Sequence, residues 1–168
     1  MLLADTLKKA YRFFPGKEAI VCGGRRWTYG EFFSRLSRFS HYLSEAGLEK
    51  GDRIAILHPN CHYFLEAYYA IALRGAAAVP LNYRLSAGEL ALIMNDAGVS
   101  VLIADPRFRE TIDRMRTDLP TVEKIIWTGD RRDGLPEGGR DLRYEEIIAG
   151  VSAPVPEVEV SEADIAQI

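Results

Sequence analysis

The residue types that most readily bind a metal ion gather in one stretch of the chain. Two imidazoles, a thiol and a carboxylate, all groups that coordinate zinc, occur at His58, Cys61, His62 and Glu66. Pro59 follows His58 directly and keeps it outside the helix that we expect from Cys61 onward. Because His58 and His62 are then not two ligands on one helical face, we favour an ordinary strand-to-helix junction over a metal site.

The segment at residues 80–85 (PLNYRL) is a second candidate site, for an anionic ligand. It lies between an expected strand and an expected helix, at the carboxyl edge of the predicted sheet, where open α/β folds bind ligands. Arg84 could hold an anionic group there through its planar guanidinium. The alternative is that Asn82 and Arg84 hold the turn by hydrogen bonds to backbone carbonyls, and position alone favours this structural role.

The sequence contains none of the short motifs that identify common nucleotide and hydrolase sites. G-x-S-x-G, G-x-G-x-x-G and G-x-x-x-x-G-K-[ST] are all absent. Residues 23–26 (GGRR) resemble a phosphate loop only superficially, because a strand follows them and not the helix N-terminus that binds phosphate. The arginine pairs at residues 25–26 and 131–132 are expected to be solvated, since neither alternates with aromatic residues as nucleic-acid surfaces do.

Composition is typical of a soluble globular protein. The 168 residues are 48% hydrophobic, and 21 Lys and Arg against 24 Asp and Glu give a net charge of −3. This mild acidity argues against nucleic acid as a partner. No apolar run approaches the roughly 20 residues of a membrane-spanning helix, and two cysteines are too few for a disulfide framework. We therefore expect a cytoplasmic protein with no membrane span.

Residues 1–50 are predicted to form a helix, a β-hairpin and a second helix. Apolar residues at helical spacing predict the first helix over residues 3–14. Two β-prone runs flank Gly-Gly at residues 23–24 and predict a hairpin, because glycine accepts the positive φ of such a turn. Thr28 and Glu31 have the spacing of a capping box, which predicts the start of the second helix.

From Gly51 onward the pattern changes to alternating strands and helices. Short apolar runs predict strands at residues 53–57, 76–81, 100–104 and 122–128. Helices are predicted between them, at residues 61–73, from the capping box at 86–89 to residue 97, and as one amphipathic helix over 106–119. Such βαβ units predict the α/β class, with a mostly parallel sheet covered by helices on both faces.

Residues 129–168 are predicted to form a loop and an extended return to the sheet. Charge, Gly and Pro predict a surface loop over 130–141, a short helix follows at 144–149, and prolines require an extended chain over 151–160. Residues 165–168 look like the beginning of a strand. A core strand that begins there needs ladder partners, so we expect this sequence to be part of a longer chain. An interrupted sheet exposes apolar surface, and we expect a tendency to form homo-oligomers.

Residues 51–92 carry motifs that are specific enough to suggest a family. The motifs are GDRIA at residues 51–55, Asn60 and Phe64 at a helix start, and PLNYRLSAGEL at 80–90. WTYGE at 27–31 and DIAQI at 164–168 extend the pattern in both directions. In these motifs the chain resembles the amino-terminal region of the adenylate-forming acyl-CoA synthetases, a superfamily that includes firefly luciferase and peptide-synthetase adenylation domains. His62-Tyr63 departs from the acidic or small residues that are common there.

The resemblance implies an ATP-dependent carboxylate–CoA ligase. Such an enzyme uses Mg and ATP to convert a carboxylate, here expected to be a fatty or aryl acid, into an acyl-adenylate and then forms the thioester with coenzyme A. The family's phosphate loop, adenine pocket and catalytic lysine would lie beyond residue 168, so the resemblance assigns this chain no catalytic residue and implies that it is inactive alone. In some relatives the arginine of the PLNxRL motif lies near the nucleotide end of coenzyme A, which suggests a binding role for Arg84.

Changes in the residue pattern at residue 51 and after residue 129 divide the chain into three parts. These are the helix, hairpin and helix of residues 1–50, the βαβ core of 51–128 and the return segment of 129–168. An alternative from another functional class is a non-catalytic α/β binding module without an active site. A run of Gly, Ser and Thr encoded directly after residue 168 would decide for the ligase.

Overall fold

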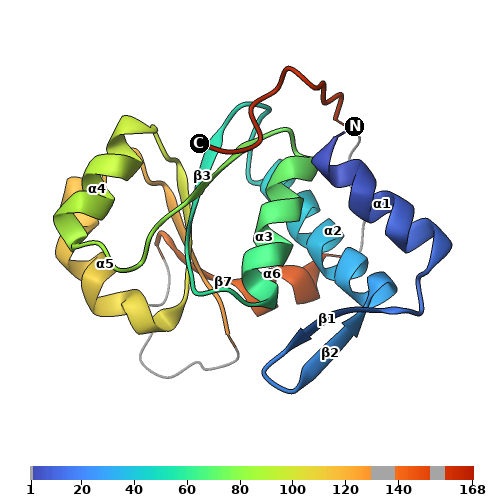
Figure 1. Cartoon of the computed structure of the whole chain (residues 1–168). Helices are drawn as coiled ribbons and strands as arrows, with labels where there is room; N and C mark the ends of the chain where they lie inside the picture. Colours follow the sequence, from blue (N-terminus) through green and yellow to red (C-terminus); the bar gives the residue numbers. More distant parts are fainter. Residues whose placement is uncertain (1, 130–138, 152–157) are drawn as a thin grey trace.

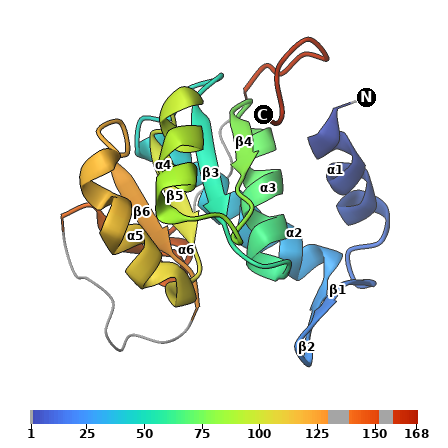
Figure 2. The same cartoon turned by 60° about the vertical axis from the view of Figure 1, so that its left-hand side comes forward.

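The structure is a computed structural model that describes residues 2–129, 139–151 and 158–168. The described residues form a parallel sheet with helices on both faces and a separate β-hairpin (Figure 1 and Figure 2). The expected α/β class is therefore confirmed.

The N-terminal elements follow in the expected order: α1 (Leu3–Phe13), β1 (Glu18–Cys22), β2 (Arg25–Thr28) and α2 (Tyr29–Glu45). β1 and β2 pair antiparallel, and both glycines between them, Gly23 and Gly24, have positive φ. The Thr28 hydroxyl accepts a hydrogen bond from the Glu31 amide at 3.2 Å, and the Glu31 carboxylate accepts one from the Thr28 amide at 2.8 Å. The latter bond lowers the pKa of Glu31, and the predicted capping box is confirmed.

All strands of the sheet run parallel, in the order β4-β3-β5-β6-β7. Their bounds are β3 (Arg53–Leu57), β4 (Ala77–Pro80), β5 (Val101–Ala104), β6 (Lys124–Trp127) and β7 (Asp141–Arg143). The accompanying helices are α3 (His62–Leu73), α4 (Ala87–Asp96), α5 (Arg109–Met115) and α6 (Tyr144–Gly150). The helix expected at residues 144–149 is confirmed as α6.

The sheet separates two apolar cores. Ile54 and Ile56 of β3 point to the face covered by α1, α2, α3 and α6. Ala55 and Leu57 alternate with them and point to the face covered by α4 and α5. Figure 1 shows these two groups of helices on opposite sides of the strands. Since both faces are buried, β3, β4, β5 and β6 consist mainly of apolar residues, which is why their sequence pattern identified them.

The single helix expected over residues 106–119 is wrong, because the structure divides this segment into three. A 3₁₀ turn, η1 (Pro106–Phe108), precedes α5, and a second, η2 (Arg116–Asp118), follows it. The Asp105 carboxylate accepts a hydrogen bond from the Arg107 amide at 2.9 Å, which fixes a tight first turn. Such 3₁₀ turns are common at both ends of α-helices, and apolar periodicity does not distinguish them.

The predicted end of the loop at Asp141 is also wrong, because Asp141 is the first residue of β7 and pairs with β6. Its carboxylate accepts hydrogen bonds from Arg116 at 2.8 Å and from the Trp127 indole at 2.7 Å. Arg116 neutralises this buried aspartate and Trp127 adds a hydrogen bond, and both lie far from Asp141 in the sequence, whereas the local sequence is typical of a loop. The rest of that predicted loop, residues 130–138, lies outside the described residues, as does most of the extended segment predicted over 151–160.

The strand expected at residues 165–168 is present only as one parallel bridge, between Gln167 and Ala78 of β4. The Ala78 amide donates to the carbonyl of Ala166 at 2.9 Å, and the Ile168 amide donates to the carbonyl of Ala78 at 3.0 Å. The segment therefore lies along the free edge of β4 and runs in the same direction as the strand.

Candidate functional site

The carboxyl edge of the sheet carries a group of polar side chains, one after each of three adjacent strands. His58 follows β3, Asp105 follows β5 and Thr128 follows β6. The His58 Nε2 atom lies 2.8 Å from the Thr128 hydroxyl and 3.5 Å from a carboxylate oxygen of Asp105. Open parallel sheets bind ligands at this edge, so it is the candidate functional region of the chain.

The contacts of His58 assign it a neutral, bridging state. Its side chain is buried, and burial lowers its pKa. Its Nδ1 atom lies 2.8 Å from the carbonyl of Pro59, which can only accept a hydrogen bond, so Nδ1 carries the proton. Nε2 lies within hydrogen-bonding distance of the Thr128 hydroxyl, which is also 3.3 Å from the carbonyl of Ala104, so the imidazole links the ends of β3 and β6 across β5.

The four residues considered as metal ligands are not brought together as one site. The Cys61 sulfur lies 3.3 Å from His58 Nδ1, and burial raises the pKa of this thiol. His62 stacks on Trp27 of the hairpin, with ring centroids 4.2 Å apart, while Glu66 binds Arg35. Within the residues that the structure describes, no group of three or more His, Cys, Asp or Glu side chains is arranged to hold a metal ion.

A partly buried ionic network that sequence reasoning missed joins α2, α3 and α6. Arg35 donates through Nε to Glu66 at 2.6 Å and through Nη2 to Glu145 at 2.7 Å. The Tyr63 hydroxyl donates to Glu145 at 2.8 Å. Burial raises the pKa of Glu66, and the hydrogen bond from Arg35 opposes that shift. The network joins three helices and fixes how they pack, and its Tyr63 ring lies 5.9 Å, centroid to centroid, from that of His58 at the carboxyl edge.

Glu66 could have been suspected from the sequence. It occupies a helix that is apolar on nearly every face, and a carboxylate in such a helix needs a buried partner. Its partner Arg35 lies on the preceding helix and has no local signal.

The Arg84 loop is built as a turn, and its guanidinium is left exposed. The Asn82 side-chain oxygen accepts a hydrogen bond from the Arg84 amide at 3.1 Å, and the Asn82 carbonyl accepts one from the Leu85 amide at 3.1 Å. The turn therefore uses the Asn82 side chain and the Arg84 backbone. The Arg84 guanidinium carbon lies 6.0 Å from the centroid of the Tyr83 ring. This side chain is exposed beyond the end of β4, where it could meet an anion.

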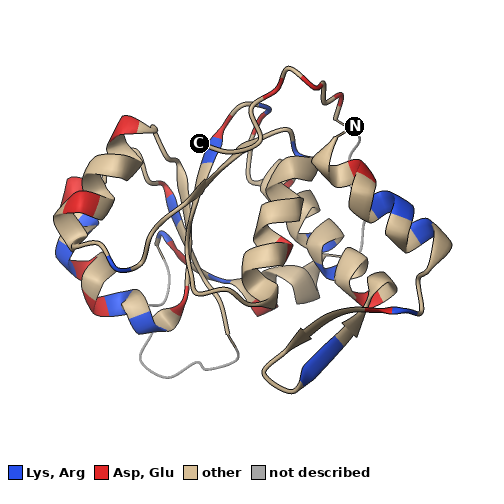
Figure 3. Cartoon of the chain, in the orientation of Figure 1, with Lys and Arg blue, Asp and Glu red and all other residues tan. Residues whose placement is uncertain are grey.

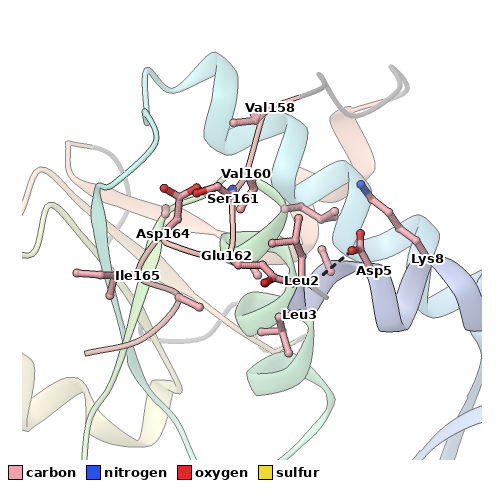
Figure 4. Close-up of a pocket in the computed structure, with 16 residues that line it drawn as sticks. Leu2, Leu3, Asp5, Lys8, Val158, Val160, Ser161, Glu162, Asp164 and Ile165 are labelled. Carbon is pink, nitrogen blue, oxygen red and sulfur yellow. Dashed lines mark hydrogen bonds between the residues drawn. The ribbon is translucent and has the colours of Figure 1, made fainter.

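A cavity of about 410 Å³ lies at the opposite edge of the sheet, near the amino end of β4. Figure 4 shows it between the start of α1 and the segment 158–166, with Leu2, Val160 and Ile165 among its labelled lining residues. The Lys50 ammonium holds that segment by an ion pair of 2.7 Å with Asp164, which lowers the pKa of Asp164. Because ligands bind at carboxyl edges in this architecture, we assign this cavity no function.

No helix among the described residues is long and apolar enough to cross a membrane.

Comparison with known proteins places this geometry in a family. The sequence profile described as "AMP-binding enzyme" matches residues 7–168. A feruloyl-CoA synthase from Amycolatopsis sp is 42% identical over 101 residues, which cover 60% of this chain and 21% of that protein. A long-chain-fatty-acid–CoA ligase from Thermus thermophilus is 34% identical over 157 residues, covering 91% of this chain and 28% of the ligase.

Solved structures agree with the sequence relatives. The N-terminal domain of FACL13 from Mycobacterium tuberculosis superposes with a TM-score of 0.86 at 29% identity, covering 100% of this chain and 41% of that one. Coronafacic acid ligase from Pectobacterium brasiliense gives a TM-score of 0.89 at 25% identity, covering 100% of this chain and 33% of the ligase.

The comparisons agree on the part of the enzyme that the chain represents. It spans 21% and 28% of the length of the two curated relatives named above, and it resembles the N-terminal region of acyl- and aryl-CoA ligases. The parallel sheet, the PLNYRL turn at its carboxyl edge and the profile match all agree with the resemblance seen in the sequence. The chain belongs to the AMP-binding enzyme family.

Proposed function

We propose that the protein to which this chain belongs is an ATP-dependent carboxylate–CoA ligase. It activates a carboxylate with ATP as an acyl-adenylate, releases pyrophosphate, and transfers the acyl group to the thiol of coenzyme A. The observation that carries the proposal is the family match over residues 7–168, together with relatives named as feruloyl-CoA and long-chain fatty-acid–CoA enzymes. These names support fatty and aryl acids as the substrate class.

The chain's own contribution is the carboxyl edge of the first parallel sheet. We assign the Arg84 guanidinium a role in binding the phosphate-bearing end of coenzyme A. Its exposure and its fork of donors, which matches phosphate oxygens, support this role. The turn is held by a hydrogen bond between the Asn82 side chain and the backbone amide of Arg84. Because the Arg84 side chain takes no part in this bond, a substitution of Arg84 should leave the fold intact.

The end of the described chain supports a place for the nucleotide beside Arg84. Gln167 pairs with Ala78 in parallel, so a chain continuing in that direction would reach the carboxyl edge next to the PLNYRL turn. The sequence resemblance puts the family's phosphate loop directly after this segment. We therefore propose that residues 1–50, 51–128 and 129–168 form three parts of one scaffold whose carboxyl edge borders the nucleotide site.

ATP and Mg are expected cofactors of the whole protein, and the residues of this chain do not fit a site for either by themselves. The sequence has no glycine-rich phosphate loop, and the described residues contain no acidic cluster that could hold a divalent cation. We assign no step of the reaction to a side chain of this fragment, and we propose that the fragment alone does not form an adenylate.

An acyl-transfer assay tests the proposal. The full-length protein is incubated with ATP, Mg, coenzyme A and a panel of fatty and aryl carboxylates, and acyl-CoA and AMP are measured by mass spectrometry. The ligase predicts formation of AMP and one or more acyl-CoA thioesters in equal amounts. A binding module predicts neither product with any carboxylate of the panel.

A further inference from the structure

The end of α1 exposes aromatic side chains that the core does not cover. Ala4 and Leu7 are buried against the neighbouring helices, so the beginning of α1 is packed. At the end of the helix, Phe13 is 60% exposed to solvent, and the next residue, Phe14, is 49% exposed. Tyr11 is 40% exposed, and its ring stacks on that of Phe33 in α2 with centroids 4.4 Å apart. The exposed rings therefore stand on a helix that is fixed to the protein.

Basic side chains surround these rings. The Lys17 ammonium lies 4.2 Å from the centroid of the Phe14 ring, and the Arg12 guanidinium carbon lies 5.9 Å from that of Phe13. Lys9 is exposed on the same helix. Residues 2–31 contain six Lys and Arg against three Asp and Glu, although the whole chain has a net charge of −3. Figure 3 shows this basic charge along α1 and β2.

Exposed aromatic rings beside basic side chains suit a partner that has an anionic outer layer and an apolar layer beneath it. Such a surface is the interface of a lipid bilayer, where aromatic rings lie at the depth of the headgroups and Lys or Arg heads meet the phosphates. The 11 residues of α1 measure roughly 16 Å, too short to span a bilayer but suited to lie in its plane. An acidic protein would also attract the basic groups. The exposed phenylalanines beside them favour a lipid bilayer, which offers apolar chains below its anionic headgroups.

We propose that a surface formed by Lys9, Tyr11, Arg12, Phe13, Phe14 and Lys17 binds lipid bilayers that contain anionic headgroups. We call it the N-terminal basic-aromatic surface. The basic residues attract the anionic bilayer, and the two phenylalanines then enter the headgroup region. This binding goes beyond the proposed ligase activity and does not depend on it.

Vesicle flotation of the full-length protein tests the proposal. Vesicles of phosphatidylcholine alone are compared with vesicles in which about one-third of the lipid is phosphatidylserine. We expect the bound fraction on the anionic vesicles to be several-fold higher and to fall strongly at about 0.5 M salt, where charges are screened. The double variant Phe13→Ser/Phe14→Ser should bind about tenfold less, whereas Phe13→Trp/Phe14→Trp should retain binding because tryptophan also favours the interface.

A matched control is Leu92→Ser on α4, which removes a side chain that is 71% exposed on the other side of the sheet. This variant should bind vesicles as the wild type does, and circular dichroism should show that every variant is folded. Equal binding to neutral and anionic vesicles overturns the proposal, as does unchanged binding by the serine double variant. Loss of a dimer in that variant, with no vesicle binding by the wild type, would instead show that a second copy of the chain covers this surface.

Discussion

Acidification should destabilise the chain through His62, which is buried and stacked on Trp27. Both ring nitrogens of His62 lack a hydrogen-bond partner among the described residues. Burial, and then the charges of Arg35 and Arg25, lower the pKa of His62 from 6.5 to about 4. The folded state therefore holds His62 neutral at a pH where the unfolded chain already binds a proton.

The sign and size of the effect follow from this difference in pKa. A depressed histidine pKa means that the unfolded state takes up more protons, so stability falls as pH decreases from about 6.5 toward about 4. Between pH 7.5 and pH 5 the contribution of His62 to the free energy of unfolding should decrease by roughly 2 kcal/mol. His58, whose pKa burial also lowers, adds a loss in the same direction.

Urea unfolding at several pH values, for the wild type and His62→Phe, isolates this contribution. Phenylalanine keeps a ring against Trp27 and removes two buried nitrogens that have no partner, so the variant should be at least as stable as the wild type at pH 7.5. Its free energy of unfolding should fall by roughly 2 kcal/mol less than that of the wild type on going to pH 5. Parallel pH profiles for the two proteins would refute the reasoning.

Other predictions concern packing, backbone strain, the proposed coenzyme A contact and assembly. Arg35→Met should lower the free energy of unfolding by about 3–5 kcal/mol, because it leaves Glu66 buried without its cation. Adding Glu66→Gln should recover part of this loss, and urea unfolding of both variants measures the two effects. Gly98→Ala should cost about 1 kcal/mol, since Gly98 has a φ of +63°, whereas Gly88→Ala, at an open helical position, should be neutral or stabilising; melting curves of the two variants test this. Arg84→Ala in the full-length enzyme should raise the KM for coenzyme A several-fold without changing the melting temperature, and an unchanged KM would remove the proposed contact. The isolated chain should self-associate with increasing concentration, and a monomer at all concentrations in size-exclusion chromatography would contradict this.

Much of the fold could be predicted because its signals are local. The capping boxes at Thr28 and Ser86 are short patterns whose hydrogen bonds form within four residues, and both are present. Strands buried on both faces leave apolar runs that identify them, as in Ile54 to Leu57. Gly47 and Gly98 were predicted to end two helices, and both have positive φ directly after the C-caps of α2 and α4.

The errors and omissions share a different cause, because each depends on partners far away in the sequence. β7 begins at Asp141, whose charge is tolerated there only through Arg116 and Trp127. The Arg35 network likewise requires α2, α3 and α6 to be packed before its geometry exists. Residue types drew attention to His58 as a possible metal ligand, but they could not show that its partner would be Thr128, after another strand.

The most direct test of the account compares ATP–pyrophosphate exchange by the 168-residue chain with exchange by the full-length protein. Both are assayed with Mg and a carboxylate that the full-length protein converts to its thioester. We predict carboxylate-dependent exchange by the full-length protein and none by the chain alone. Exchange by residues 1–168 alone, or no exchange by the full-length protein with any fatty or aryl acid, would contradict the account.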